Sequence, residues 1–135
     1  MYAKLLTAAL VFAAPLACVA ATSVTINANS NCISSPFGPT AGGAAVRIPL
    51  APGRYVFSLI SNDMSCSNGD LSAGCLIDTV FLQGGWGSAR WGTVVTAKPT
   101  VVDMTQATME LAAYVGDDGC SNNTGTAVIQ IQTVN

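Results

Sequence analysis

Oxygen-bearing side chains are concentrated in one short stretch near the C-terminus of the chain. Residues 116–125 hold two carboxylates, two side-chain amides and three glycines, between an apolar run and an alternating one. Such oxygens suit a hard cation, because calcium takes roughly six to eight oxygen ligands in a tolerant geometry. The candidate metal ligands are Asp117, Asp118, Asn122 and Asn123.

A simple turn is the alternative interpretation of these residues. Asp, Asn and Gly form turns through side-chain bonds to the backbone and through tolerance of positive φ. The segment also lacks the regular ligand spacing of an EF-hand loop. The residues alone therefore leave a calcium site and a turn both open.

The motif Asn122-Asn123-Thr124-Gly125-Thr126, followed by alternating Val128, Ile129 and Ile131, resembles the closing motif of the PA-IL-like calcium-dependent galactose lectins of bacteria. The resemblance implies a galactose-binding-domain-like β-sandwich in which calcium binds sugar hydroxyls, with galactosides as the glycan partner. It implies that Asn122 and Asn123 match the family's calcium-binding Asn pair, and that Asp117 or Asp118 matches its Asp. The loop is shorter than in the family and contains a cysteine, and the chain has no histidine to match the family's sugar-contacting one.

Aromatic residues offer a second way to contact a sugar. Trp86 and Trp91 lie in a glycine-rich segment beside Arg90, and Tyr114 precedes the oxygen-rich stretch. Trp and Tyr present large, rigid surfaces with a polar edge, which suits the apolar face of a sugar ring. The tryptophans are five residues apart, so on one continuous strand they face opposite sides. The alternative is that Trp91 fills the core and Trp86 covers a sheet edge or loop.

The first 21 residues have the pattern of a secretory signal peptide, with Lys4, an apolar run and small residues before a cleavage site after Ala21. Cleavage of the 135-residue chain there leaves residues 22–135, or 114 residues, the size of one domain. Pro15 argues against lipidation of Cys18. We therefore expect a secreted or periplasmic protein that has no membrane segment after cleavage.

Four cysteines remain after that cleavage, which in an exported chain predicts two disulfides. Four cysteines allow three pairings, and we favour Cys66 with Cys75 and Cys32 with Cys120. A zinc site is the rival, but no C-x-x-C pair is present.

The net charge of the chain after cleavage argues against two classes of partner, nucleic acids and anionic membranes. After cleavage, four cationic side chains face seven anionic ones, a net charge of −3. This gives no basic footprint for nucleic acid and no attraction to anionic membranes.

Short alternating or β-branched runs predict about eight strands and no helix. The expected strands cover residues 23–27, 44–50, 54–61, 77–82, 92–97, 100–103, 109–115 and 127–132. The run 54–61 is apolar on both faces, which predicts a central strand. An all-β antiparallel sandwich of the jelly-roll or galactose-binding-domain-like type follows.

Catalysis is disfavoured, because the chain has no histidine and its cysteines are expected to be paired. Two functions remain. One is a secreted calcium-dependent carbohydrate-binding module with no catalytic residues, and the other is a disulfide-stabilised structural or interaction protein. Apolar surface left after folding could serve a homo-oligomer in either case.

Overall fold

The computed structural model describes residues 21–34, 42–86, 88–105 and 110–134, and its regular structure is almost entirely β. The expected signal peptide lies outside these residues except for Ala21. No helix in the described part of the chain has the length and apolar character that crossing a bilayer requires.

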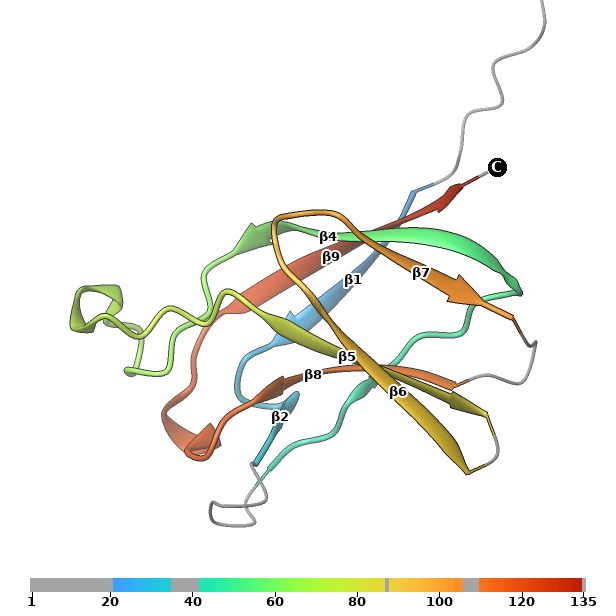
Figure 1. Ribbon diagram of the computed structural model, residues 1–135. Coiled ribbons are helices and arrows are strands. Elements are labelled where there is room, and N and C mark those ends of the chain that lie inside the picture. The colour runs from blue at the N-terminus through green and yellow to red at the C-terminus, as the bar shows by residue number, and fades with distance from the viewer. Residues whose placement is uncertain (1–20, 35–41, 87, 106–109, 135) are drawn as a thin grey trace, which may run out of the picture.

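Two sheets pack face to face as a sandwich (Figure 1). The first sheet has the order β1-β9-β4-β7, formed by β1 (Thr22–Asn27), β9 (Thr126–Val134), β4 (Gly53–Asn62) and β7 (Thr100–Met104). The second has the order β2-β8-β5-β6, formed by β2 (Cys32–Ile33), β8 (Glu110–Gly116), β5 (Val80–Trp86) and β6 (Ala89–Val95), while β3 (Val46–Arg47) also pairs with β8. Two short 3₁₀ turns, η1 (Leu71–Ala73) and η2 (Cys120–Asn122), lie in loops.

The predicted all-β sandwich and its disulfide pairs are confirmed. β4 lies between β9 and β7, as its two apolar faces predicted. β9 buries Ala127, Ile129 and Ile131 on one face, because alternate residues of a strand point to the same side. These side chains meet Phe57 and other residues of both sheets in one core.

Three details differ from the expected strands. β2 pairs with β8 in the parallel direction, over two residues. The expected strand 44–50 is reduced to Val46–Arg47, although Ile48 N still donates to Leu111 O, because Pro49 has no N–H to continue the ladder. The expected strand 77–82 starts at Val80, since Ile77 N is used by Met64 O of a neighbouring loop.

Candidate functional site

The oxygen-rich segment connects β8 to β9, and so crosses from one sheet to the other. It meets two other loops at the same end of the sandwich. We call residues 27–31, 62–76 and 117–125 together the loop end. Backbone bonds join its parts: Ser65 and Thr124 exchange hydrogen bonds of 3.0 and 2.9 Å, and Asn68 N donates to Asn122 O at 3.0 Å.

One disulfide lies within the loop end, and the other joins the loop end to the start of β2. Cys32 and Cys120 join the turn after β1 to the oxygen-rich segment, with Cα atoms 5.6 Å apart. Cys66 and Cys75 close a short loop, with Cα atoms 5.3 Å apart. Such bonds are typical of proteins from an oxidising compartment.

The turn before β9 depends on a glycine. Gly125 has φ of +84°, and a Cβ atom there would lie 2.3 Å from Asp63 O. The same Asp63 accepts a hydrogen bond from Thr126 N at its carboxylate, at 2.6 Å. The chain can therefore enter β9 at this angle only with glycine in place.

Asn122 and Asn123 hold different loops, although they are adjacent in sequence. Asn122 Nδ2 donates to Cys66 O at 2.9 Å. Asn123 is only 2% exposed, and its Nδ2 donates to Ala28 O at 3.2 Å and lies 3.4 Å from Cys32 Sγ. The amide nitrogens thus fix the segment against two neighbouring loops.

The amide oxygens of the same two residues have no partner. Asn122 Oδ1 and Asn123 Oδ1 are both buried and accept no hydrogen bond among the described residues. Leaving a buried acceptor unpaired costs roughly 1–3 kcal/mol. Two such atoms on consecutive residues therefore require an explanation, and an ion is one of the usual ones.

The two carboxylates have different surroundings. Asp117 is half-buried, and its Oδ1 accepts a hydrogen bond from Gly119 N at 3.1 Å. Asp118 is exposed. Of the two candidates, Asp117 is the one whose side chain is held within the segment.

The donor set of the segment fits calcium better than a transition metal. The described residues gather no group of three His, Cys, Asp or Glu side chains, which zinc and similar ions prefer. Calcium also takes amide oxygens. Asn122 Oδ1, Asn123 Oδ1 and the Asp117 carboxylate are three donors of that class in one segment.

The tryptophan segment is a hairpin, so the assumption of one continuous strand is wrong. β5 ends at Trp86 and β6 starts at Ala89, and the two residues are paired. Trp91 is paired with Gly84 and is packed against the core, where a Cβ atom on Gly84 would lie 2.1 Å from its ring. Trp91 therefore serves mainly the core, while the side chain of Trp86 lies outside what the structure describes.

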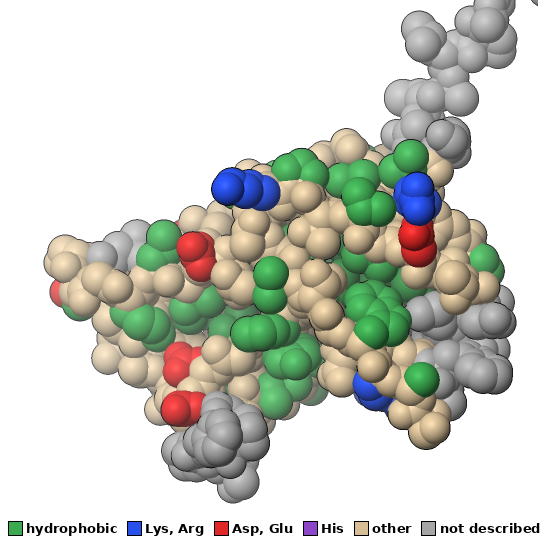
Figure 2. All heavy atoms as spheres, in the orientation of Figure 1, with side chains coloured by type: hydrophobic (Ala, Val, Ile, Leu, Met, Phe, Trp, Pro, Cys, Tyr) green, Lys and Arg blue, Asp and Glu red, His purple; other side chains and the backbone are tan. Residues whose placement is uncertain are grey.

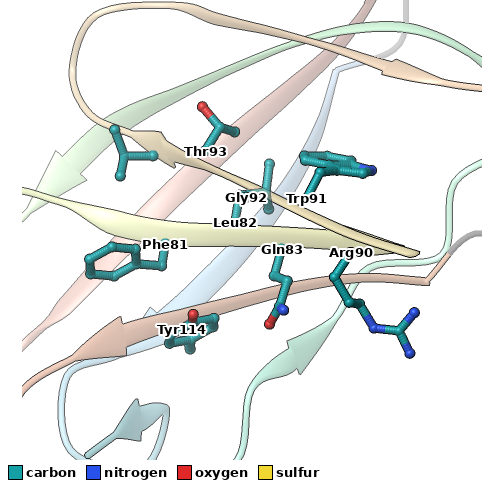
Figure 3. A pocket seen from close by; sticks show the side chains of 9 residues that line it. Phe81, Leu82, Gln83, Arg90, Trp91, Gly92, Thr93 and Tyr114 are labelled. Carbon is teal, nitrogen blue, oxygen red and sulfur yellow. The ribbon is translucent and has the colours of Figure 1, made fainter. Parts of the chain in front are cut away.

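Tyr114 belongs to an exposed surface on the outer side of the second sheet. Its ring stacks on Phe81 of β5, with centroids 5.6 Å apart and planes at 18°. Gln83 and Arg90 extend to this same side, whereas Trp91 extends to the other (Figure 3). We call Phe81, Gln83, Arg90 and Tyr114 the aromatic face.

A groove of about 470 Å³ lies along the aromatic face, where small-molecule sites of roughly 300–1,000 Å³ are usual. Phe81 and Gln83 were not among the residues predicted from sequence to bind a ligand. They alternate with the core residues Val80 and Leu82, so strand periodicity could have placed them outward. Their proximity to Tyr114 needed the strand register, which sequence alone does not give.

No protein-family model matches the chain, and comparison with curated proteins and with solved structures found no match.

Proposed function

We propose that this chain is a secreted, non-catalytic, calcium-dependent carbohydrate-binding module. The observation that carries the proposal is the pair of buried, unpaired amide oxygens on Asn122 and Asn123. The expected signal peptide and the two disulfides support export to the periplasm or the exterior. The resemblance of Asn122-Asn123-Thr124-Gly125-Thr126 to the closing motif of the PA-IL-like lectins supports galactosides as the sugar class.

Asn122, Asn123 and Asp117 would hold the ion. The amide nitrogens of both asparagines are anchored on backbone carbonyls of other loops, so their oxygens have fixed orientations. Outer contacts of this kind orient metal ligands in other proteins. Bound calcium would supply a positive charge that sugar hydroxyls can coordinate.

The absence of histidine from the sequence supports a binding role over a catalytic one. The four cysteines of the described chain are all in disulfides, so none is available as a thiolate nucleophile. The usual base and nucleophile of hydrolytic triads are therefore missing.

A structural or protein-interaction role is the second candidate. It is favoured by the hydrogen bonds of the segment, since both Asn amide nitrogens and the Asp117 carboxylate already satisfy backbone groups. The predicted self-association would use exposed apolar residues such as Ile60, Leu76 and Val101, and sedimentation velocity tests it.

Thermal unfolding in calcium and in chelator tests the proposal. A ligand present at about 100 times its Kd stabilises the native state by about 2.7 kcal/mol. In a domain of this size such a gain raises the Tm by roughly 10 °C. We expect this rise in the wild type and a much smaller one in Asp117→Asn, which loses the charge that attracts the ion.

Asp118→Asn is the matched control, because it removes the same charge one residue away at an exposed position. It should retain most of the calcium response. An unchanged wild-type Tm at about 10 mM calcium, above the roughly millimolar Kd of weak extracellular sites, would reject the calcium site and leave the structural role.

A further inference from the structure

The outward residues of the second sheet form three rows across the strands. In the first row, Phe81 is paired with Tyr114 on one side and Val94 on the other, which gives an apolar wall. In the middle row, Gln83 is paired with Ala112 and Gly92. In the third row, Gly85 is paired with Arg90 on one side and Glu110 on the other. The small residues on both sides of Gln83 leave a surface depression between the apolar first row and Arg90.

Gln83 separates two hollows within this depression. One is the groove of about 470 Å³, which includes Gly92, and the other is a hollow of about 240 Å³ toward β3 and β8, which includes Ala112. Gln83, Arg90 and Tyr114 line both. A ligand that fills both hollows would therefore cross Gln83.

Two glycines leave room for long side chains to lie flat against this surface. A Cβ atom on Gly85 would lie 2.6 Å from Arg90 Cδ, and one on Gly116 would lie 2.9 Å from the Phe81 ring. Arg90 and Phe81 therefore lie over glycines of the neighbouring strands.

The polar groups at the centre remain accessible. Gln83 is exposed. Phe81 is 41% exposed despite its stack on Tyr114. Few charged side chains interrupt the exposed hydrophobic groups on this side of the molecule (Figure 2).

We propose that the aromatic face binds an oligosaccharide, with one sugar ring in each hollow and the Gln83 amide hydrogen-bonded between them, and that this contact does not require calcium. The inference takes its ligand class from the proposed function but uses a different surface. A sugar ring has apolar C–H faces, which suit stacked aromatic rings, and a rim of hydroxyls. The Gln83 amide both donates and accepts, so it matches hydroxyls that do both.

Binding to an array of immobilised neutral and acidic oligosaccharides, from disaccharides upward, tests the inference in calcium and in chelator. Three variants of the full mature chain are compared with the wild type. Gln83→Ala removes the central amide. Gly92→Val fills the larger hollow, and it should fold, since a Cβ atom there meets only Leu82 O at 3.8 Å and valine favours strands. Gln132→Ala removes an exposed glutamine from β9 of the other sheet and serves as the control.

We expect the wild type to bind at least one oligosaccharide in both buffers. Gln83→Ala and Gly92→Val should each weaken that binding about tenfold or more, with Tm unchanged or raised in Gly92→Val, while Gln132→Ala binds as the wild type does. Binding that disappears in chelator and in Asp117→Asn, but is unchanged in Gln83→Ala and Gly92→Val, would overturn this inference and leave the proposed function intact.

Two further outcomes would overturn it. If no oligosaccharide is retained, both the inference and the sugar-binding part of the proposed function fail, whatever calcium does to the Tm. If the wild type instead self-associates and Gly92→Val abolishes the association in sedimentation velocity, the face is an interface between copies of the chain.

Discussion

The loop end and the aromatic face use their polar groups in opposite ways. In the loop end, Asn122 and Asn123 direct their amide nitrogens at backbone carbonyls, and only their oxygens are left over. On the aromatic face, the Gln83 side chain is exposed. The polar side chains of the loop end thus mostly stabilise the fold, whereas the strands β5 and β8 present exposed side chains.

The glycines of the two regions differ in the same way. Gly125 is needed by the backbone, because of its positive φ and its contact with Asp63 O. Gly92 occupies open space and its backbone needs no glycine. Glycine within a strand often marks a place where a ligand approaches the backbone closely. Gly92 lies in a sheet beside exposed aromatic and amide groups, although the fold does not require glycine there.

The largest effect should come from opening the disulfides of the loop end. Cys32 and Cys120 are 88 residues apart, and Cys66 and Cys75 are 9 apart. By the chain-entropy model these bonds contribute about 4.6 and 2.6 kcal/mol. We expect C32A/C120A to lose more stability than C66A/C75A in urea unfolding, and the reverse order would show that the short loop, not the long connection, holds the loop end together.

An intermediate effect separates the two classes of glycine. Gly125→Ala should destabilise the domain by about 1–3 kcal/mol, because alanine is strained at positive φ and its Cβ meets Asp63 O. Gly92→Ala should instead be neutral or stabilising by about 0.4–1 kcal/mol, through the lower entropy of the unfolded chain. Urea unfolding of both variants measures the difference, and equal losses would remove the distinction between the two regions.

The smallest expected effect is a pH-dependent change in the Tm that comes from Asp70 in the loop end. Hydrogen bonds from the Ser72 hydroxyl, at 2.5 Å, and from Ser72 N, at 2.9 Å, lower the pKa of Asp70. A lowered folded-state pKa gives stability that is present above the unfolded pKa of about 3.9 and is lost as the pH falls through the folded value. Asp70→Asn should therefore have a slightly lower Tm than the wild type at neutral pH, and the gap should close in acid.

Asp118→Asn, compared in chelator, is the control for that prediction, since Asp118 is exposed. It should leave the Tm almost unchanged across the same pH range. A gap for Asp70→Asn that persists in acid would mean that the substitution acts through the conformation of the turn and not through the charge.

Strand periodicity and cysteine parity were sufficient to predict the sandwich, the central position of β4 and the buried face of β9. The favoured pair Cys66–Cys75 rested on the composition of the short loop that it closes, and the favoured pair Cys32–Cys120 on the two regions that it ties together. The buried face of β9 depends on local sequence, because a strand's faces alternate whatever it pairs with.

Features that depend on register or on the third dimension were not accessible from sequence. The spacing of Trp86 and Trp91 could not reveal the hairpin between them, because glycines serve strands and turns alike. Asn122 and Asn123 looked like one convergent pair, yet their amide nitrogens serve Cys66 and Ala28, two loops that are distant in sequence. The neighbourhood of Phe81 and Tyr114 required the pairing of β5 with β8.

The pairing of the first and last strands gives the domain a particular response to mechanical force. Thr22 is opposite Ile131, so the two ends of the described chain emerge side by side (Figure 1). Pulling on them would unzip β1 from β9 one hydrogen bond at a time, which needs little force. The extension would stop at the Cys32–Cys120 bond, beyond which the chain between these cysteines carries no load. The extension of a domain pulled at both ends would thus be limited to the segments outside this bond.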